Sequence, residues 1–153
     1  MDVLAVSDSH GIVNNLTRIL EREKECKTVF FLGDGARDIE YCKSRFPDRR
    51  FVCVKGNNDW GSSEETEAYR YIEGNTVIAV HGHLFGVRYG LHELARKAES
   101  VRADVALYGH THKADISFIN GISLINPGAV CDGRYAVITL GKDGPFPSLR
   151  SLY

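Results

Sequence analysis

The stretch DVALYGHTHKADISFINGISLIN, Asp104 to Asn126, is the part of the sequence within which we expect the mode of strand pairing to change. It begins with the short apolar strand DVALY (104–108), which runs into a loop containing two histidines separated by one residue. Two alternating apolar stretches then surround Asn120-Gly121, a dipeptide typical of a tight hairpin turn. The sequence after the histidine loop therefore predicts antiparallel pairing.

Upstream of this stretch, short apolar strands alternate with amphipathic helices. The expected strands are 2–6, 28–32, 50–55, 67–73, 76–80 and 104–108, and the expected helices are 12–24, 39–46 and 91–101. Helices placed between strands are typical of βαβ units, whose strands run parallel. The antiparallel part continues to YAVITL (135–140), which is expected to close the chain as its last strand. The sequence thus predicts an α/β fold with one mixed sheet or two packed sheets.

Composition and charge exclude several classes of protein. The chain has 153 residues, 43% of them hydrophobic and 25% charged, and we expect one globular domain over residues 1–153. A formal net charge of −1 and the lack of a basic track argue against a long nucleic acid as partner. The apolar runs are too short for a membrane span and Asp2 is unlike the start of a signal peptide, so we expect a cytoplasmic protein without a membrane partner. Four cysteines without CxxC spacing are expected to be small buried residues rather than disulfides or zinc ligands: Cys26, Cys42, Cys53 and Cys131.

Five of the expected strands end at residues that can bind a metal ion. These ends are Ser7-Asp8-Ser9-His10, Gly33-Asp34-Gly35, Gly56-Asn57-Asn58-Asp59, His81-Gly82-His83 and Gly109-His110-Thr111-His112. Ligands bind at the carboxyl ends of strands in open α/β sheets. One such end is more often an ordinary turn, but together the five use five of the six histidines. The sixth, His92, is expected early in the last long helix, on the surface or partly packed.

The donors at these strand ends are oxygens and imidazoles, without a thiolate. The set is Asp8, His10, Asp34, Asn57, His81, His110 and His112. Such donors suit Mn²⁺, Fe²⁺, Zn²⁺, Co²⁺ or Ni²⁺ rather than Ca²⁺. Seven donors are too many for one tetrahedral ion and suit two ions that share a carboxylate. Two divalent ions about 3.5–4 Å apart can clamp a phosphate and activate a water between them, so this set points to phosphate chemistry.

The ordered motifs D-x-H, G-D, G-N-x-D, H-G-H and G-H-T-H resemble the calcineurin-like metallophosphoesterases. The short length and GHTH are similar to the small prokaryotic phosphodiesterase branch of that superfamily, to which the retromer small subunit is also related. INPGA (125–129) resembles the tail of the same branch. The resemblance implies a four-layer α-β-β-α sandwich, with two mixed sheets flanked by helices.

The resemblance also implies a role for each motif residue. It gives Asp8, His10 and His112 to a first metal, and Asn57, His81 and His110 to a second, with Asp34 bridging. We expect Mn²⁺ in both places, with Ni²⁺, Fe²⁺, Zn²⁺ or Co²⁺ as alternatives. His83 would either support a ligand or contact the substrate.

Two residues depart from the family pattern. Many relatives have a histidine where this chain has Asn58, and Asp59 would be available to orient such a histidine. An amide cannot protonate a departing alcohol, so we expect substrates with easily expelled leaving groups. Ala129 stands where relatives often have serine, and we attach no mechanism to it.

The leading hypothesis is an enzyme that hydrolyses small phosphodiesters, in which a hydroxide held between two divalent ions attacks phosphorus. Preference for a diester rests on the resemblance alone, so a phosphomonoesterase with the same mechanism is an alternative. A scaffold with weak activity, similar to the retromer subunit, is a further one. His10 discriminates between an enzyme and a scaffold, because a degenerate scaffold has no reason to retain all seven ligands. The sequence does not decide between a monomer and a homo-oligomer.

Overall fold

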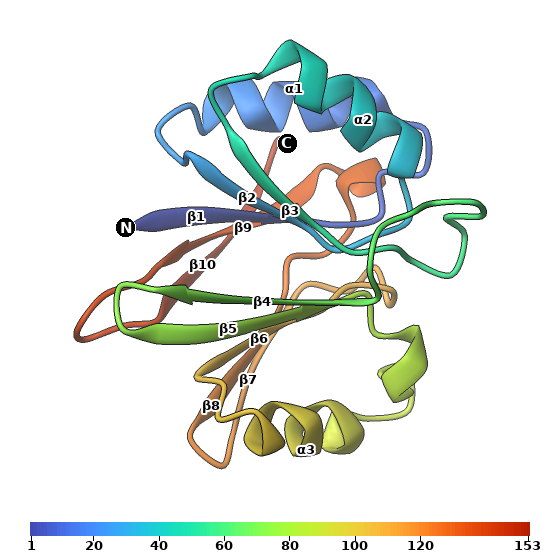
Figure 1. Ribbon diagram of the computed structural model, residues 1–153. Coiled ribbons are helices and arrows are strands. Elements are labelled where there is room, and N and C mark those ends of the chain that lie inside the picture. The colour runs from blue at the N-terminus through green and yellow to red at the C-terminus, as the bar shows by residue number, and fades with distance from the viewer.

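Two five-stranded sheets stack face to face, and helices cover their outer faces (Figure 1). The computed structural model describes residues 1–153. The first sheet has the order β10-β9-β1-β2-β3 and the second the order β4-β5-β6-β8-β7. The strands are β1 (Asp2–Val6), β2 (Thr28–Phe31), β3 (Arg50–Cys53), β4 (Glu67–Ile72), β5 (Asn75–Val80), β6 (Val105–Leu107), β7 (Asp115–Ile119), β8 (Ile122–Asn126), β9 (Arg134–Thr139) and β10 (Phe146–Ser151). Both sheets contain parallel and antiparallel pairs, which confirms the predicted α-β-β-α sandwich.

Three helices form the outer layers. In Figure 1, α1 (Val13–Arg22) and α2 (Ala36–Arg45) lie above the first sheet, and α3 (His92–Ser100) lies below the second. Two short 3₁₀ turns, η1 (His83–Phe85) and η2 (Val130–Asp132), complete the structure. Helix α2 begins three residues before the predicted range 39–46, because its first turn is polar and carries no apolar periodicity. None of the helices has the length and apolar character that a membrane crossing requires.

Strand β1 shows how one apolar run serves two core layers. Leu4 and Val6 pack under α1 and α2, whereas Val3 and Ala5 point between the two sheets. Successive side chains of a strand face opposite sides, so a parallel strand covered on both sides needs an uninterrupted apolar sequence. A third apolar layer, which includes Leu94, joins α3 to the second sheet.

The predicted hairpin is present at the edge of the second sheet. β7 and β8 pair antiparallel, with Ile119 opposite Ile122. Asn120 and Gly121 have φ values of 51° and 81°, as a type I′ turn requires.

The prediction that residues 135–140 close the chain is wrong. A further strand, β10, pairs antiparallel with β9 at the edge of the first sheet. It contains Pro147, and its side chains are exposed or half-buried. An edge strand of this kind tolerates proline and lacks the apolar alternation by which a buried strand is identified.

The five loops that carry the predicted ligands meet at one end of the sandwich. β1, β2 and β3 run parallel in the first sheet, as do β5 and β6 in the second. The loops that follow these strands lie at the right-hand end of Figure 1. Parallel strands in both layers therefore deliver their polar ends to one place.

Candidate metal centre

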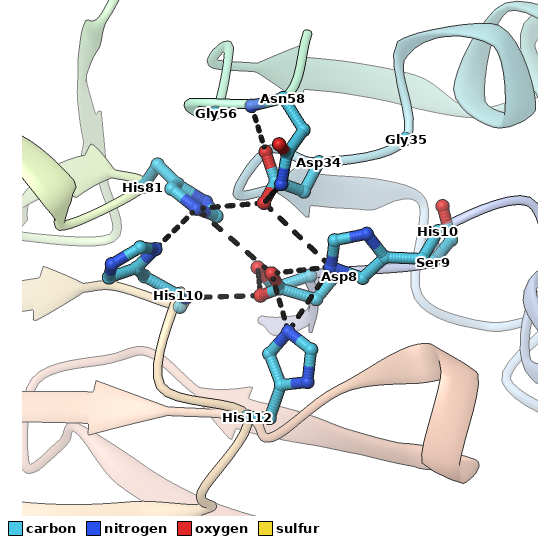
Figure 2. A network of polar contacts seen from close by, with 12 residues as sticks. Asp8, Ser9, His10, Asp34, Gly35, Gly56, Asn58, His81, His110 and His112 are labelled. Atoms are coloured by element: carbon cyan, nitrogen blue, oxygen red, sulfur yellow. Dashed lines mark hydrogen bonds and ion pairs between the residues drawn. The ribbon is translucent and has the colours of Figure 1, made fainter.

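The seven predicted ligands form two adjoining groups at this end of the molecule. We name Asp8, His10 and His112 the outer group, and Asp34, Asn57, His81 and His110 the inner group. Figure 2 shows six of these side chains pointing toward one another, from loops far apart in the sequence. His92, in contrast, is exposed at the start of α3 and joins neither group.

In the outer group, three donor atoms converge. Nε2 of His10 lies 3.1 Å from Nε2 of His112, and Oδ1 of Asp8 lies 3.3 Å and 3.2 Å from these two nitrogens. Two ligands bound about 2.1 Å from one ion are about 3.0–3.4 Å apart at octahedral or tetrahedral angles. The outer group therefore has the spacing of a coordination shell.

The carboxylate of Asp8 is oriented by hydrogen bonds to its second oxygen. Oδ2 accepts from the Ser7 hydroxyl at 2.5 Å and from the backbone N–H of His110 at 3.0 Å. Both donors act on the same oxygen, so Oδ1 remains directed toward the histidines (Figure 2).

The inner group has similar spacing around His81. Nε2 of His81 lies 3.0 Å from Oδ1 of Asn57, 3.3 Å from Oδ2 of Asp34 and 3.2 Å from Nδ1 of His110. The other ring nitrogen, Nδ1, donates to the carbonyl of Leu32 at 2.7 Å. Because Nδ1 then carries the proton, the lone pair of Nε2 faces the inner group, as a metal ligand requires.

Asp34 lies between the two groups. Its Oδ2 is 3.3 Å from Nε2 of His81 and 3.7 Å from Nε2 of His10. Asn58 donates its backbone N–H to Oδ1 at 2.9 Å and its side-chain amide to Oδ2 at 3.0 Å. Burial opposes ionisation, but the neighbouring His81 ring and the hydrogen bonds from Asn58 hold the pKa of Asp34 well below its usual range. Asp34 therefore places a negative charge within reach of both groups.

The charge balance of the centre calls for cations. The carboxylates of Asp8 and Asp34 are buried, and their ion-pair partners are histidines only. Burial lowers the pKa of His81, but Asp34 and Asp8 outweigh it and raise that pKa overall. Buried charges are normally paired or coordinate metals, so the donor set fits divalent ions.

Backbone strain is concentrated at the same residues. Five of the seven predicted ligands have positive φ: Asp8 (57°), His10 (44°), Asp34 (62°), His110 (71°) and His112 (63°). Non-glycine residues with positive φ are uncommon, and strained residues gather at functional sites. The strain is thus a second sign, independent of residue type, that these loops form a site.

Glycines beside the ligands permit close approach of the loops. A Cβ atom on Gly56 would lie 2.1 Å from Oδ1 of Asp34, and one on Gly109 would lie 2.0 Å from Oγ of Ser7. Neither position has room for a side chain.

Asp59 and His83 lie beside the two groups rather than within them. The Asp59 carboxylate accepts four backbone N–H groups at 2.7–3.0 Å, and these come from Asp34, Gly35, Ala36 and Gly56. It therefore fastens the β2 loop to the β3 loop. The His83 ring centroid lies 5.4 Å from that of His81, and its Nδ1 is buried without a partner. Burial lowers the pKa of His83.

Some neighbours of the centre could not be identified from the sequence. Nε of Arg88 donates to Nε2 of His110 at 3.0 Å, and no pattern distinguishes this exposed arginine from others. Cys131 is half-buried and, with Asp132, lies near His112, so it is less buried than predicted. Asn126 of INPGA donates to the carbonyl of Gly109 at 3.2 Å, and thus the tail motif supports the GHTH loop.

Comparison with known sequences gives one family. The family model of the calcineurin-like phosphoesterase superfamily domain matches residues 1–141. The chain is 33% identical over 151 residues to the probable metallophosphoesterase YsnB of Bacillus subtilis, covering 94% of this chain and 86% of that one. It is 24% identical over 151 residues to the phosphodiesterase MJ0936 of Methanocaldococcus jannaschii, covering 92% and 91%.

Solved structures share the fold. A predicted phosphoesterase from Streptococcus pneumoniae superposes with a TM-score of 0.84 at 23% identity, covering 98% of this chain and 88% of that one. Vps29 from Entamoeba histolytica superposes with a TM-score of 0.79 at 19% identity, covering both chains fully.

Proposed function

This chain belongs to the calcineurin-like phosphoesterase superfamily, and we propose that it is a phosphodiesterase acting on small diesters with two divalent metal ions. The observation that carries the proposal is the convergence of the outer and inner groups on two buried carboxylates, Asp8 and Asp34. A single-ion site would need no bridging carboxylate and no second set of histidines. The family implies divalent metal ions, and the number and position of the ions are our inference.

We assign the outer ion to Asp8, His10 and His112, and the inner ion to Asn57, His81 and His110. Asp34 would serve both ions. Mn²⁺ is the ion we expect, and Ni²⁺, Fe²⁺, Zn²⁺ and Co²⁺ suit the same donors. When bound, such a pair supplies charge stabilisation for the phosphate and a hydroxide nucleophile at neutral pH.

The residues around the centre favour leaving groups that need no proton. The Asn58 amide donates to Asp34 and cannot supply a proton to an alcohol. The Asp59 carboxylate is engaged by four backbone N–H groups, so it is a positioning residue for the β2 and β3 loops. We propose that His83, with its unpartnered Nδ1, contacts the substrate phosphate. Arg88 would add a cation beside His110.

The two alternatives to this proposal are a phosphomonoesterase and a scaffold with weak activity. The name of the Methanocaldococcus relative supports a diester, and a phosphomonoesterase would use the same residues. The likeness to Vps29 is one of fold and is compatible with a scaffold. Retention of all seven donors, His10 among them, favours an enzyme. We also propose a cytoplasmic location, since the cysteines are free thiols and such thiols persist in reducing compartments.

The test is hydrolysis by protein stripped of metal and then reconstituted with Mn²⁺. Bis(4-nitrophenyl) phosphate and 4-nitrophenyl phosphate form a matched diester and monoester with the same leaving group. We expect turnover that requires metal and a higher kcat/KM for the diester. His92→Ala is the control, because His92 is an exposed histidine outside both groups. Full activity of protein confirmed to contain no metal would overturn the proposal, and a higher kcat/KM for the monoester would reassign the substrate.

A further inference from the structure

A hollow of about 390 Å³ opens beside the metal centre, between α2 and the loop that follows β3. His10 and Asp34 line it, so it is continuous with the proposed phosphate position. The other side chains that matter here are Arg37, Asp38, Asn58 and Trp60. Small-ligand sites are about 300–1,000 Å³, so the hollow has room for one substituent of a diester.

Trp60 is the feature that gives this hollow a chemical preference. It is the only tryptophan of the chain, and 91% of its surface is exposed. Trp60 is one of the residues that line the hollow, so its ring is within reach of a flat group placed there. Single exposed apolar residues are common on proteins, but this one adjoins two predicted metal ligands.

The polar groups that line the hollow are mostly engaged within the protein. Oδ2 of Asp38 accepts from the Ser9 hydroxyl at 2.6 Å and from the Gly11 N–H at 2.9 Å. The Asn58 amide donates to Asp34. Arg37, in contrast, is exposed and forms no ion pair. A ligand in the hollow therefore meets one aromatic face and one cation.

We propose that the hollow binds the nucleobase of the substrate, which makes the substrate a small nucleotide diester. The proposal rests on the proposed function, because it places the phosphate of the same molecule at the metal centre. The base would stack on Trp60, and Arg37 would face the ring edge or the phosphate. Nucleobases are the flat substituents that biological phosphodiesters carry, and aromatic residues recognise them by stacking.

The first experiment uses Trp60 as its own reporter, without catalysis. Zn²⁺-loaded protein is titrated with AMP, ribose 5-phosphate or inorganic phosphate, and tryptophan emission is excited where adenine does not absorb. We expect a saturable change with AMP only. Ribose 5-phosphate should displace AMP with an affinity about 5- to 150-fold weaker, the range given by stacking of one base. Equal affinity for AMP and ribose 5-phosphate without a change in emission would overturn the proposal.

The second experiment compares two diesters with the same 4-nitrophenyl leaving group, one carrying thymidine and the other a methyl group. Trp60→Ala should lower kcat/KM for the thymidine diester about 5- to 150-fold more than for the methyl diester. Trp60→Phe should recover part of this difference. Tyr71→Ala is the matched control, because Tyr71 is an exposed aromatic residue (76%) on β4 that does not line the hollow.

The outcomes separate this proposal from the proposed function. An equal loss for both diesters would place the nitrophenyl group on Trp60 and overturn the nucleotide assignment. If neither diester were hydrolysed with any metal, the proposed function would fail. The emission titration with AMP would still decide whether the hollow binds a base.

Discussion

The outer and inner groups contain the same kinds of donor but are built differently. His81 of the inner group is fully buried, whereas His10 and His112 of the outer group have side-chain exposures of 30% and 39%. Each inner histidine also makes a hydrogen bond through its other ring nitrogen. His81 donates to the carbonyl of Leu32, and His110 accepts from Arg88. The contacts of the outer histidines involve Nε2 only.

The differences in burial and hydrogen bonding indicate which group is preorganised for metal binding. A histidine whose second nitrogen is held has a fixed tautomer and ring orientation, and loss of such a partner typically weakens metal binding about 10–100-fold. In the inner group, His81 meets this condition without any ion, because its Nδ1–H donates to the carbonyl of Leu32. The outer group is completed by His10 and His112, two exposed side chains whose rings are not otherwise fixed. We therefore expect a tightly held inner ion and an exchangeable outer ion.

The largest effect is expected from Asp34, which we propose to bridge the two ions. Asp34→Asn should abolish binding of both ions and lower kcat/KM by more than about 100-fold, because both groups lose a charged ligand. Asp8→Asn should chiefly remove the outer ion. Elemental analysis of each variant, with His92→Ala as control, measures the stoichiometry. If Asp34→Asn bound as much metal as the parent, Asp34 would not bridge the two groups.

Graded removal of metal should separate the two groups directly. With a chelator of increasing strength we expect release in two steps, with apparent dissociation constants that differ about 10–100-fold. Activity should fall with the first step, since the outer ion is then absent. His81→Asn should abolish the second step, and His112→Asn the first. Release of both ions in one step from the parent would contradict the expected difference in affinity between the outer and inner groups.

A smaller effect is expected from crowding the inner group. Gly56→Ala would place a Cβ atom 2.1 Å from Oδ1 of Asp34 and displace that carboxylate or the loop. We expect a loss of about 1–3 kcal/mol in the free energy of unfolding and weaker binding of the inner ion. Gly141→Ala is the matched control, because nothing lies within 4 Å of its added atom. Chemical denaturation with and without metal measures both effects, and equal behaviour of the two variants would contradict the packing argument.

The smallest effect concerns the leaving group. Asn58→His would introduce a proton donor, and should weaken the dependence of rate on leaving-group pKa across a series of diesters. It should bring little gain for nitrophenyl esters, which leave without protonation. The substitution also removes the hydrogen bond to Asp34, so Asn58→Ala is needed to measure that loss alone. Parallel plots for parent and histidine variant would show that position 58 has no acid role.

The sequence predicted the buried parts of the molecule better than its edges. Strands such as β1 and the turn at Asn120-Gly121 carry strong local signals, and the five polar strand ends located the centre. Strand β10 was missed because an exposed edge strand with a proline has no apolar period. Arg88 lies beside His110 and Trp60 lines the hollow only because of the tertiary structure, and nothing in the residues next to them in the sequence indicates these positions.

The role of Asp59 in joining the β2 and β3 loops could not be predicted from the sequence either. A single aspartate after a strand suggests a ligand or an orienting group, and the sequence could not show that four backbone N–H groups would occupy it. Such contacts depend on how the β2 and β3 loops meet in space. The residue types at the centre were predictable, but the network that supports them was not.

The left-handed backbone at five of the ligand positions has a consequence for how this chain can evolve. Each such residue costs about 1–2 kcal/mol relative to glycine, while a whole domain is stable by only about 5–15 kcal/mol. In a lineage without use for the ions, substitution by glycine at His10 or His112, whose side chains are partly exposed, would be neutral for activity and would relieve this strain. Mutation would then erase the centre, so the presence of all seven donors in this chain is what continued selection for ion binding predicts.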